Sequence, residues 1–159
     1  MTRVTMRLEG GDQLQAALRN LSAEAQKHVG DAVNATGLEL RGDIIRRIQS
    51  GPKTGRIYTH HFFTDGAGNL RRGRPRSKPH QASKAGEAPA SDGGRLASGI
   101  DYKREGPMSA TVGSQVVYAA MLEFGTSKID PRPAWVPATE AMRPKFRQRL
   151  EAALARATR

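Results

Sequence analysis

Histidine, serine and acidic side chains in the middle of the chain are the groups that could perform chemistry. A metal site would have to use His60, His61, His80 and Asp65. No two histidines stand four residues apart on a predicted helix, and the surrounding segment offers no rigid frame for ligands. Ser91 and Ser98 would be the nucleophiles of a hydrolase, but neither lies in a strand-turn-helix elbow. We therefore expect no enzyme, no metal and no cofactor.

Other catalytic patterns are also missing. The glutamates are scattered, and no motif pairs two of them for acid–base work. No glycine run ends in the Gly-Lys-Ser/Thr of a phosphate-binding loop. The chain has no cysteine, which excludes a disulfide framework and a cysteine-based metal site. These absences direct attention from catalysis to binding and assembly.

Positive charge is the strongest feature of the composition. The 159 residues include 26 Lys and Arg against 15 Asp and Glu, for a net charge of +11. This excess of positive charge favours a polyanionic partner or a nearby negatively charged surface, although a contribution to solubility alone also explains it. Only 37% of the residues are apolar and 5% aromatic. We expect a single domain with a modest core and with part of the chain outside it.

The N-terminal sequence and the hydropathy of the chain predict the cellular compartment of the protein. The first residues, MTRVTMRLEGG, lack the apolar core of a signal peptide. No run of about 18 apolar residues predicts a membrane-spanning helix. We expect a protein made in a cytoplasm, with no membrane contact.

The charge is concentrated in a segment rich in Gly, Pro and Ser. Residues 51–86 hold eight cations against one acid. Apolar residues are sparse there, so we expect an extended basic loop over residues 51–93, with a small hairpin near Ile57 and Phe63. Few aromatic residues are interleaved, which argues against a base-stacking surface. The cations that would face a partner or DNA are Arg56, Arg71, Arg72, Arg74, Arg76, Lys78 and Lys84.

The N-terminal 50 residues are predicted to form a strand and helices. Val4, Met6 and Leu8 alternate with polar residues, as in a half-buried strand. Asp12 can cap a short helix after it. Apolar residues spaced by three or four then predict a long amphipathic helix from Ala23 to Gln49, capped by Ser22. Three small positions within it predict close approach of a neighbouring element: Gly30, Gly37 and Gly42.

Residues 94–159 are predicted to form strands and helices. A turn capped by Asp92 should precede two strands, Ile100–Glu105 and Ala110–Ser114, with Tyr102 and Val112 pointing inward. A last helix should run from near Pro137 to about Ala157. The order of elements predicts an α+β fold: two long helices pack on a small antiparallel sheet, and a long basic loop extends from it.

A short helix and a proline-rich clamp lie between those strands and the last helix. Helical spacing of Tyr118, Met121, Leu122 and Phe124 predicts one buried face. Gly125 stands where a left-handed residue would end this helix. Glu123 either lies exposed to solvent at the end of this helix or forms a salt bridge with an arginine of a neighbouring subunit. Arg132, held between two prolines, is its candidate partner within or between chains.

Two segments carry a family resemblance: GEAPASDGGRLASGI, residues 86–100, and TVGSQVVYAAMLEFGTSKIDPRPAWVPA, residues 111–138. They resemble the gene-ten-like tail-component family of long-tailed bacteriophages, which are neck or head–tail joining proteins. The shared pattern is a GRL segment, a VG strand, YA-x-x-x-EFGT and a Pro-Arg-Pro clamp. Gly99 replaces the usual second serine of the first segment. The resemblance covers most of the chain, and Gly51 to Lys84 is the least constrained part.

The resemblance implies a structural virion protein of the neck, located in the virion at the head–tail interface, that completes the tail or joins it to the head. It would assemble as a ring around the DNA channel, of six subunits or else of twelve. Its neighbours would be portal, adaptor, stopper or tail-tube proteins, with non-specific contact to packaged DNA. Subunit contacts are expected at Tyr118, Glu123, Phe124, Gly125, Thr126, Arg132, Pro133 and Trp135.

Several choices stay open at this level. The basic loop would either reach a neighbouring protein or face the lumen through which DNA passes. A basic nucleic-acid-binding module would explain the charge without any ring. A small tail-associated hydrolase is a further alternative, to be recognised by loss of activity when one serine, histidine or acid is replaced.

Overall fold

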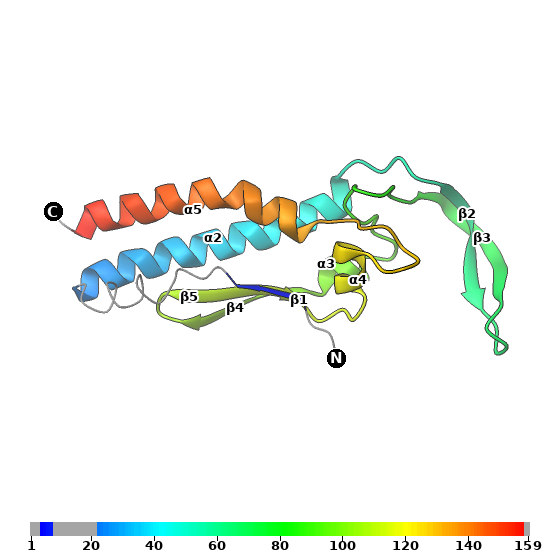
Figure 1. The fold of residues 1–159 in the computed structure, drawn as a ribbon, viewed down its shortest axis with the longest axis horizontal. Coiled ribbons are helices and arrows are strands. Elements are labelled where there is room, and N and C mark those ends of the chain that lie inside the picture. Colours follow the sequence, from blue (N-terminus) through cyan, green and yellow to red (C-terminus); the bar gives the residue numbers. More distant parts are fainter. Residues whose placement is uncertain (1–3, 8–21, 158–159) are drawn as a thin grey trace.

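The computed structural model describes residues 4–7 and 22–157, with side chains described for residues 22–157. The short helix expected after Asp12 lies outside these residues. Helix α5 (Trp135–Ala157) lies antiparallel along helix α2 (Ala23–Ser50), and α2 also covers one face of a small sheet (Figure 1). The α+β prediction, with two long helices and an antiparallel sheet, is therefore confirmed.

The sheet has three antiparallel strands in the order β1-β5-β4: β1 (Val4–Arg7), β5 (Ser109–Ser114) and β4 (Ile100–Gly106). Val112 stands opposite Met6 on one side and Tyr102 on the other. Val112 is buried and Tyr102 is half-buried, as their spacing predicted. The Tyr102 hydroxyl donates a hydrogen bond to Asn34 Oδ1 at 2.5 Å, which ties β4 to α2.

Helix α2 forms where the apolar spacing predicted it. Ser22 Oγ accepts a hydrogen bond from Ala25 N at 3.3 Å, which confirms the cap. A Cβ atom at Gly37 would lie 2.5 Å from a ring carbon of Tyr102, and one at Gly30 would overlap the carbonyl oxygen of Pro107. These glycines are required because the sheet approaches the helix backbone at both points. No such approach occurs at Gly42, whose nearest neighbour is the flexible side chain of Arg46 at 3.5 Å.

The main core lies between the end of α2, the start of α5 and the sheet. Its fully buried members include Trp135, Leu40, Ile44, Ile48, Ile100 and Met142. Helix α5 begins at Trp135, slightly before the expected start, with Pro137 in its first turn. Glu39 of α2 pairs with Arg149 and, at 2.8 Å, with Lys145 of α5. Packing and ion pairs together hold the two long helices side by side.

The segment expected as an extended loop is a two-stranded antiparallel hairpin. Strand β2 (Ile57–Thr64) pairs with β3 (Leu70–Gln81), and the hairpin projects from one end of the molecule (Figure 1). The small hairpin anticipated near Ile57 is thus far longer than predicted. The sequence did not reveal the length of this hairpin. Neither face of the hairpin is buried, so its strands show no alternation of apolar and polar residues. Pro75 and Pro79 are compatible with β3 because no other described strand pairs with the outer edges of this ribbon.

A compact turn closes the hairpin. Asp65 Oδ1 accepts hydrogen bonds from Ala67 N at 3.0 Å and Asn69 N at 2.8 Å. Gly68 has φ of 83°, a backbone conformation that favours glycine. The Asp-Gly-Ala-Gly-Asn sequence therefore supplies the turn chemistry that brings the strands together.

Two short helices complete the fold: α3 (Arg95–Ser98) and α4 (Ala119–Phe124). The prediction that Asp92 caps the turn before β4 is wrong, because the N-cap residue of α3 is Gly94. Asp92 instead pairs with Arg76 of the hairpin. No helix among residues 22–157 is long and apolar enough to cross a membrane.

Candidate assembly surface

Glu123 connects the end of α4 to the start of α5. Its side chain is 3% exposed. One carboxylate oxygen accepts hydrogen bonds from Ala134 N at 2.7 Å and Trp135 N at 3.1 Å, and the other accepts one from Val136 N at 2.7 Å. These amides form the positive end of α5, where a carboxylate is stabilised by the helix dipole and by charge-assisted hydrogen bonds. The last turn of α4 is thereby fixed to the first turn of α5.

This arrangement corrects both interpretations of Glu123. The residue is neither a solvated helix end nor exposed for a salt bridge with a neighbouring subunit. None of the ion pairs among residues 22–157 joins it to Arg132, whose Nε is buried without a hydrogen-bond partner there. Trp135 is fully buried, so it belongs to the core and not to a contact surface. A capping role was difficult to predict because Glu123 lies 11, 12 and 13 residues before the three amides that it binds.

The turn after α4 is closely packed. Gly125 has φ of 76° and ψ of −178°, which only glycine adopts readily, and this confirms the predicted positive φ. A Cβ atom there would lie 2.8 Å from the carbonyl oxygen of Ile129 and 2.9 Å from Cδ of Pro131. Thr126 N donates to Ile129 O at 2.8 Å, and Thr126 Oγ1 accepts from Ile129 N at 3.1 Å. The loop folds back tightly on the end of the helix.

The predicted burial of α4 is wrong for most of its large apolar residues. Tyr118, Met121 and Phe124 are 38%, 48% and 63% exposed. Ala119 and Glu123 turn inward instead, with Leu122 half-buried. Helical spacing showed that one face is apolar, but it could not show which face meets the core. The buried carboxylate of Glu123 decides the rotation, because it must reach the start of α5.

Five exposed apolar residues lie on α4 and on the segments directly before and after it. Tyr118, Met121 and Phe124 are spaced by three, so they share one side of α4. Val117 precedes them at 63% exposure, and Ile129, 41% exposed, is brought next to the helix end by the turn at Gly125. We call this surface the apolar patch: Val117, Tyr118, Met121, Phe124 and Ile129. Clustered exposed apolar residues of this kind mark interaction sites more often than scattered ones do.

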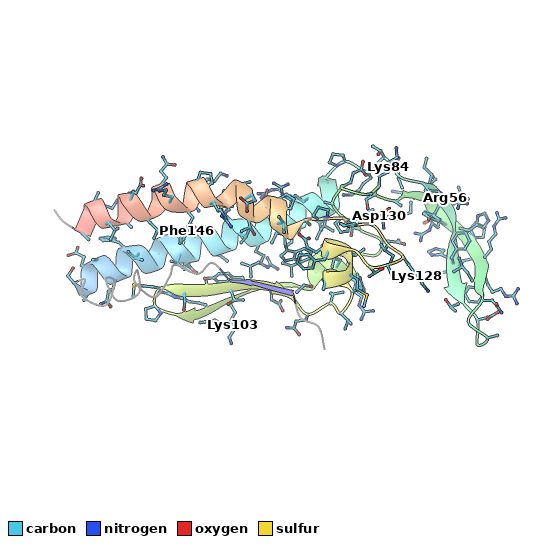
Figure 2. The ribbon with its side chains drawn as sticks, in the orientation of Figure 1. Arg56, Lys84, Lys103, Lys128, Asp130 and Phe146 are labelled. Carbon is cyan, nitrogen blue, oxygen red and sulfur yellow. The ribbon has the colours of Figure 1, made fainter. Side chains whose placement is uncertain are left out.

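The clamp connects the patch to the hairpin. Arg132 N donates to Leu122 O at 2.6 Å, and Gly86 N donates to Pro131 O at 2.9 Å. Lys128 and Asp130, on the loop between α4 and α5, lie on the side of the body nearest the hairpin (Figure 2). Thr126 is exposed and Pro133 is half-buried. Three of the expected contact residues are therefore the most exposed to solvent: Tyr118, Phe124 and Thr126.

The base of the hairpin is fastened by polar contacts. Lys53 Nζ donates to Arg47 O at 3.1 Å and Ala88 O at 2.8 Å, and its removal from water lowers the pKa of Lys53. Glu87 accepts from Thr54 Oγ1 at 2.6 Å and from Lys84 N at 2.8 Å. These hydrogen bonds, led by that of the Thr54 hydroxyl, lower the pKa of Glu87 to about 2.

A second fastening point lies farther along the hairpin. Arg76 binds Asp92 through two parallel hydrogen bonds of 2.8 and 2.6 Å. Its Nε also donates to His60 O at 3.2 Å. The guanidinium holds the pKa of Asp92 below its usual range. This fork geometry fixes the direction in which the hairpin leaves the body.

Two of the residues considered for catalysis, His61 and His80, lie near Asp92: after the hydrogen bond from Arg76, their charges also lower the pKa of Asp92. His60 contacts Thr59 Oγ1 and the guanidinium of Arg72, and Ser98 Oγ donates to the carbonyl of Arg95. Across residues 22–157, no group of three His, Cys, Asp or Glu residues gathers as metal ligands would. The arrangement of this region is that of a rigid surface with a projecting basic hairpin.

Comparisons with protein-family models, with curated proteins and with solved structures found no match for this chain.

Proposed function

We propose that this protein is a structural, non-enzymatic component of a bacteriophage particle that acts at the neck, between head and tail. In this role it assembles as a ring of copies around the DNA channel and contacts portal, adaptor, stopper or tail-tube proteins. The proposal draws on the sequence resemblance for its biological setting. From the structure it draws on one observation, the apolar patch on α4.

The patch suits a subunit interface because it is apolar and because hydrogen bonds and close contacts constrain the segment that carries it. Val117 and Phe124 are each 63% exposed; Val117 lies just before α4, and Phe124 is its last residue, next to Glu123, which holds the helix end to α5. A surface that does not rearrange loses little conformational entropy on binding. Aromatic and Met side chains are enriched in the buried centres of protein interfaces. A ring further requires that the patch meets a different surface of the next copy, so that contacts close on themselves.

Sedimentation velocity over a range of protein concentrations tests the assembly. We expect the wild type to form a defined oligomer, and Phe124→Ser or Met121→Ser to shift it to the monomer. The matched control is Leu38→Ser, which removes an apolar side chain that is 51% exposed on α2, outside the patch. A wild type that stays monomeric at all concentrations, or equal effects of Phe124→Ser and Leu38→Ser, would refute assembly through the patch.

The location in the particle has its own test. Mass spectrometry of purified phage particles should detect the protein in a fixed ratio to portal protein, and electron microscopy should show a ring of density at the neck. Its absence from purified particles would refute the proposal even if the isolated protein forms oligomers.

A further inference from the structure

The projecting hairpin lacks a core of its own. We call residues 56–84 the arm. Four of its apolar side chains are exposed: Ile57 at 57%, Phe62 at 44%, Phe63 at 55% and Leu70 at 71%. Among residues 4–7 and 22–157, no further strand pairs with either outer edge of the arm (Figure 1). An isolated two-stranded hairpin is marginally stable in water, so the arm is suited to a partner that lies along it.

Charge identifies the chemistry of that partner. The arm holds seven cations and one acid, Asp65. Asp65 is bound by Arg71 at 2.7 Å, and Arg76 is bound by Asp92 of the body. The remaining cations have no carboxylate within ion-pair distance among the described residues: Arg56, Arg72, Arg74, Lys78 and Lys84. Arg56 and Lys84 lie at the end of the arm that joins the body (Figure 2).

Another copy of this chain is a poor partner for such an arm. Each copy has a net charge of +11, so a second copy offers the basic arm no excess of negative charge. Most carboxylates between residues 22 and 157 already hold a partner in their own chain. Those engaged in this way are Glu24, Glu39, Asp43, Asp65, Glu87, Asp92, Asp101, Glu105, Glu123, Glu140 and Glu151.

Aromatic and basic side chains share one face of the arm. The guanidinium carbon of Arg56 lies 5.5 Å from the centre of the Tyr58 ring. Tyr58 in turn meets Phe62 edge to face, with ring centres 5.9 Å apart. On the opposite strand, Arg72 contacts the ring of His60 at 2.9 Å. The composition had argued against a surface of this kind, but strand pairing gathers the few aromatic residues beside the arginines.

We propose that the arm binds nucleic acid, with Arg72, Arg74 and Lys78 on the phosphates and the Tyr58–Phe62 face against the sugars or bases. A two-stranded ribbon fits the major groove of a duplex, and exposed aromatic rings next to arginines also stack on single-stranded bases. The shared chemistry is the phosphodiester backbone. This binding concerns a different surface from the apolar patch; only its setting, DNA inside a ring, rests on the proposed function.

Fluorescence anisotropy with the full chain tests this proposal. The probes are a labelled 20-nucleotide single strand and the corresponding duplex, each titrated at several salt concentrations. The arm variant is Arg72→Ala/Arg74→Ala/Lys78→Ala. The control variant, Arg143→Ala/Arg147→Ala/Arg156→Ala, removes the same charge from α5. Circular dichroism verifies that both variants are folded.

We expect the arm variant to bind about tenfold or more weakly than the wild type at low salt, and the control variant to bind nearly as well as the wild type. Log affinity decreases with log salt concentration, and the magnitude of this slope should be smaller in the arm variant. The decrease in magnitude should be about 0.9 for each duplex phosphate that is no longer neutralised, or about 0.7 for each phosphate of a single strand. Equal reductions in the two variants would overturn the assignment to the arm. A folded wild type that binds neither probe would overturn it as well, and would favour an acidic protein partner.

Phe62→Ser distinguishes the two forms of nucleic acid. A weakening confined to the single strand assigns stacking on single-stranded bases, and a weakening confined to the duplex assigns contact within a groove. Unchanged binding to both probes would overturn the role given to the Tyr58–Phe62 face. The same samples separate this inference from the proposed assembly. Phe124→Ser, which should be monomeric, must still bind through the arm. A monomeric wild type that binds nucleic acid refutes the assembly alone, and an oligomer that binds none refutes the arm alone.

Discussion

The carboxylate of Glu123, in the last turn of α4, accepts a hydrogen bond of 2.7 Å from the backbone N–H of Val136 in the first turn of α5. Through this contact and those to Ala134 and Trp135, one side chain sets the angle between the two helices. It also rotates α4 so that Met121 and Phe124 face solvent. The surface proposed for assembly thus depends on a buried acid that does not belong to it.

Removal of this cap should destabilise the fold. Glu123→Ala leaves buried amides without a partner and should lower the free energy of unfolding by about 2–4 kcal/mol. Glu123→Gln keeps an acceptor oxygen and should cost less. Urea denaturation measures both effects. Glu140→Gln, at an exposed position of α5, serves as the control and should stay within about 0.5 kcal/mol of the wild type. An equally mild effect of Glu123→Ala would contradict the capping role.

Gly125 should tolerate no other residue. Gly125→Val combines a β-branched side chain with φ of 76° and with contacts below 3 Å to Ile129 and Pro131. We expect a destabilisation of about 2 kcal/mol or more, seen as a lower thermal midpoint. Gly66→Ala in the hairpin turn is the comparison, because no atom lies within 4 Å of the added Cβ. Similar midpoints for these two variants would show that the turn is not constrained as described.

The body should fold without the arm. Ile57 and Gln81 are paired across the two strands, so residues 58–80 can be replaced by Asn-Gly, a favoured two-residue hairpin turn. The buried core contains none of the removed residues. We expect a helical circular dichroism spectrum and, because the removed residues are exposed or only half-buried and their main contact with the body is the Arg76–Asp92 pair, an unfolding free energy within about 1 kcal/mol of the wild type. Loss of helical signal in this variant would mean that the arm is part of the folding unit.

Acid should weaken the base of the arm. The pKa of Glu87 is lowered from 4.5 to about 2 in the folded chain, first by the Thr54 hydroxyl. A carboxylate with a depressed pKa contributes stability above its unfolded value, and this contribution is lost as pH falls from about 4.5 toward about 2. Titration of the Glu87 carboxyl carbon by NMR measures the pKa. Thr54→Ala should raise it, and Thr59→Ala on the arm should not. An ordinary pKa in the wild type would contradict the contacts at this base.

The periodic parts of the fold could be predicted from the sequence, because one buried face leaves a repeating pattern. The α2 helix, its Ser22 cap and the strands around Tyr102 and Val112 were located in this way. Gly125 could be recognised as a turn because few residues adopt a positive φ. The arm was assigned as a loop because both of its faces are exposed, and strands without a buried side carry no alternation.

What the sequence by itself determined was local: where helices begin and end, which turns need glycine, and that the positive charge lies in one segment. The tertiary structure alone decided how these parts face one another. It placed Glu123 at the start of α5, turned Phe124 outward, and gathered Arg56, Tyr58 and Phe62 on one side of the arm. The physical reason is that such placements depend on contacts between distant residues, whose geometry no local pattern in the chain records.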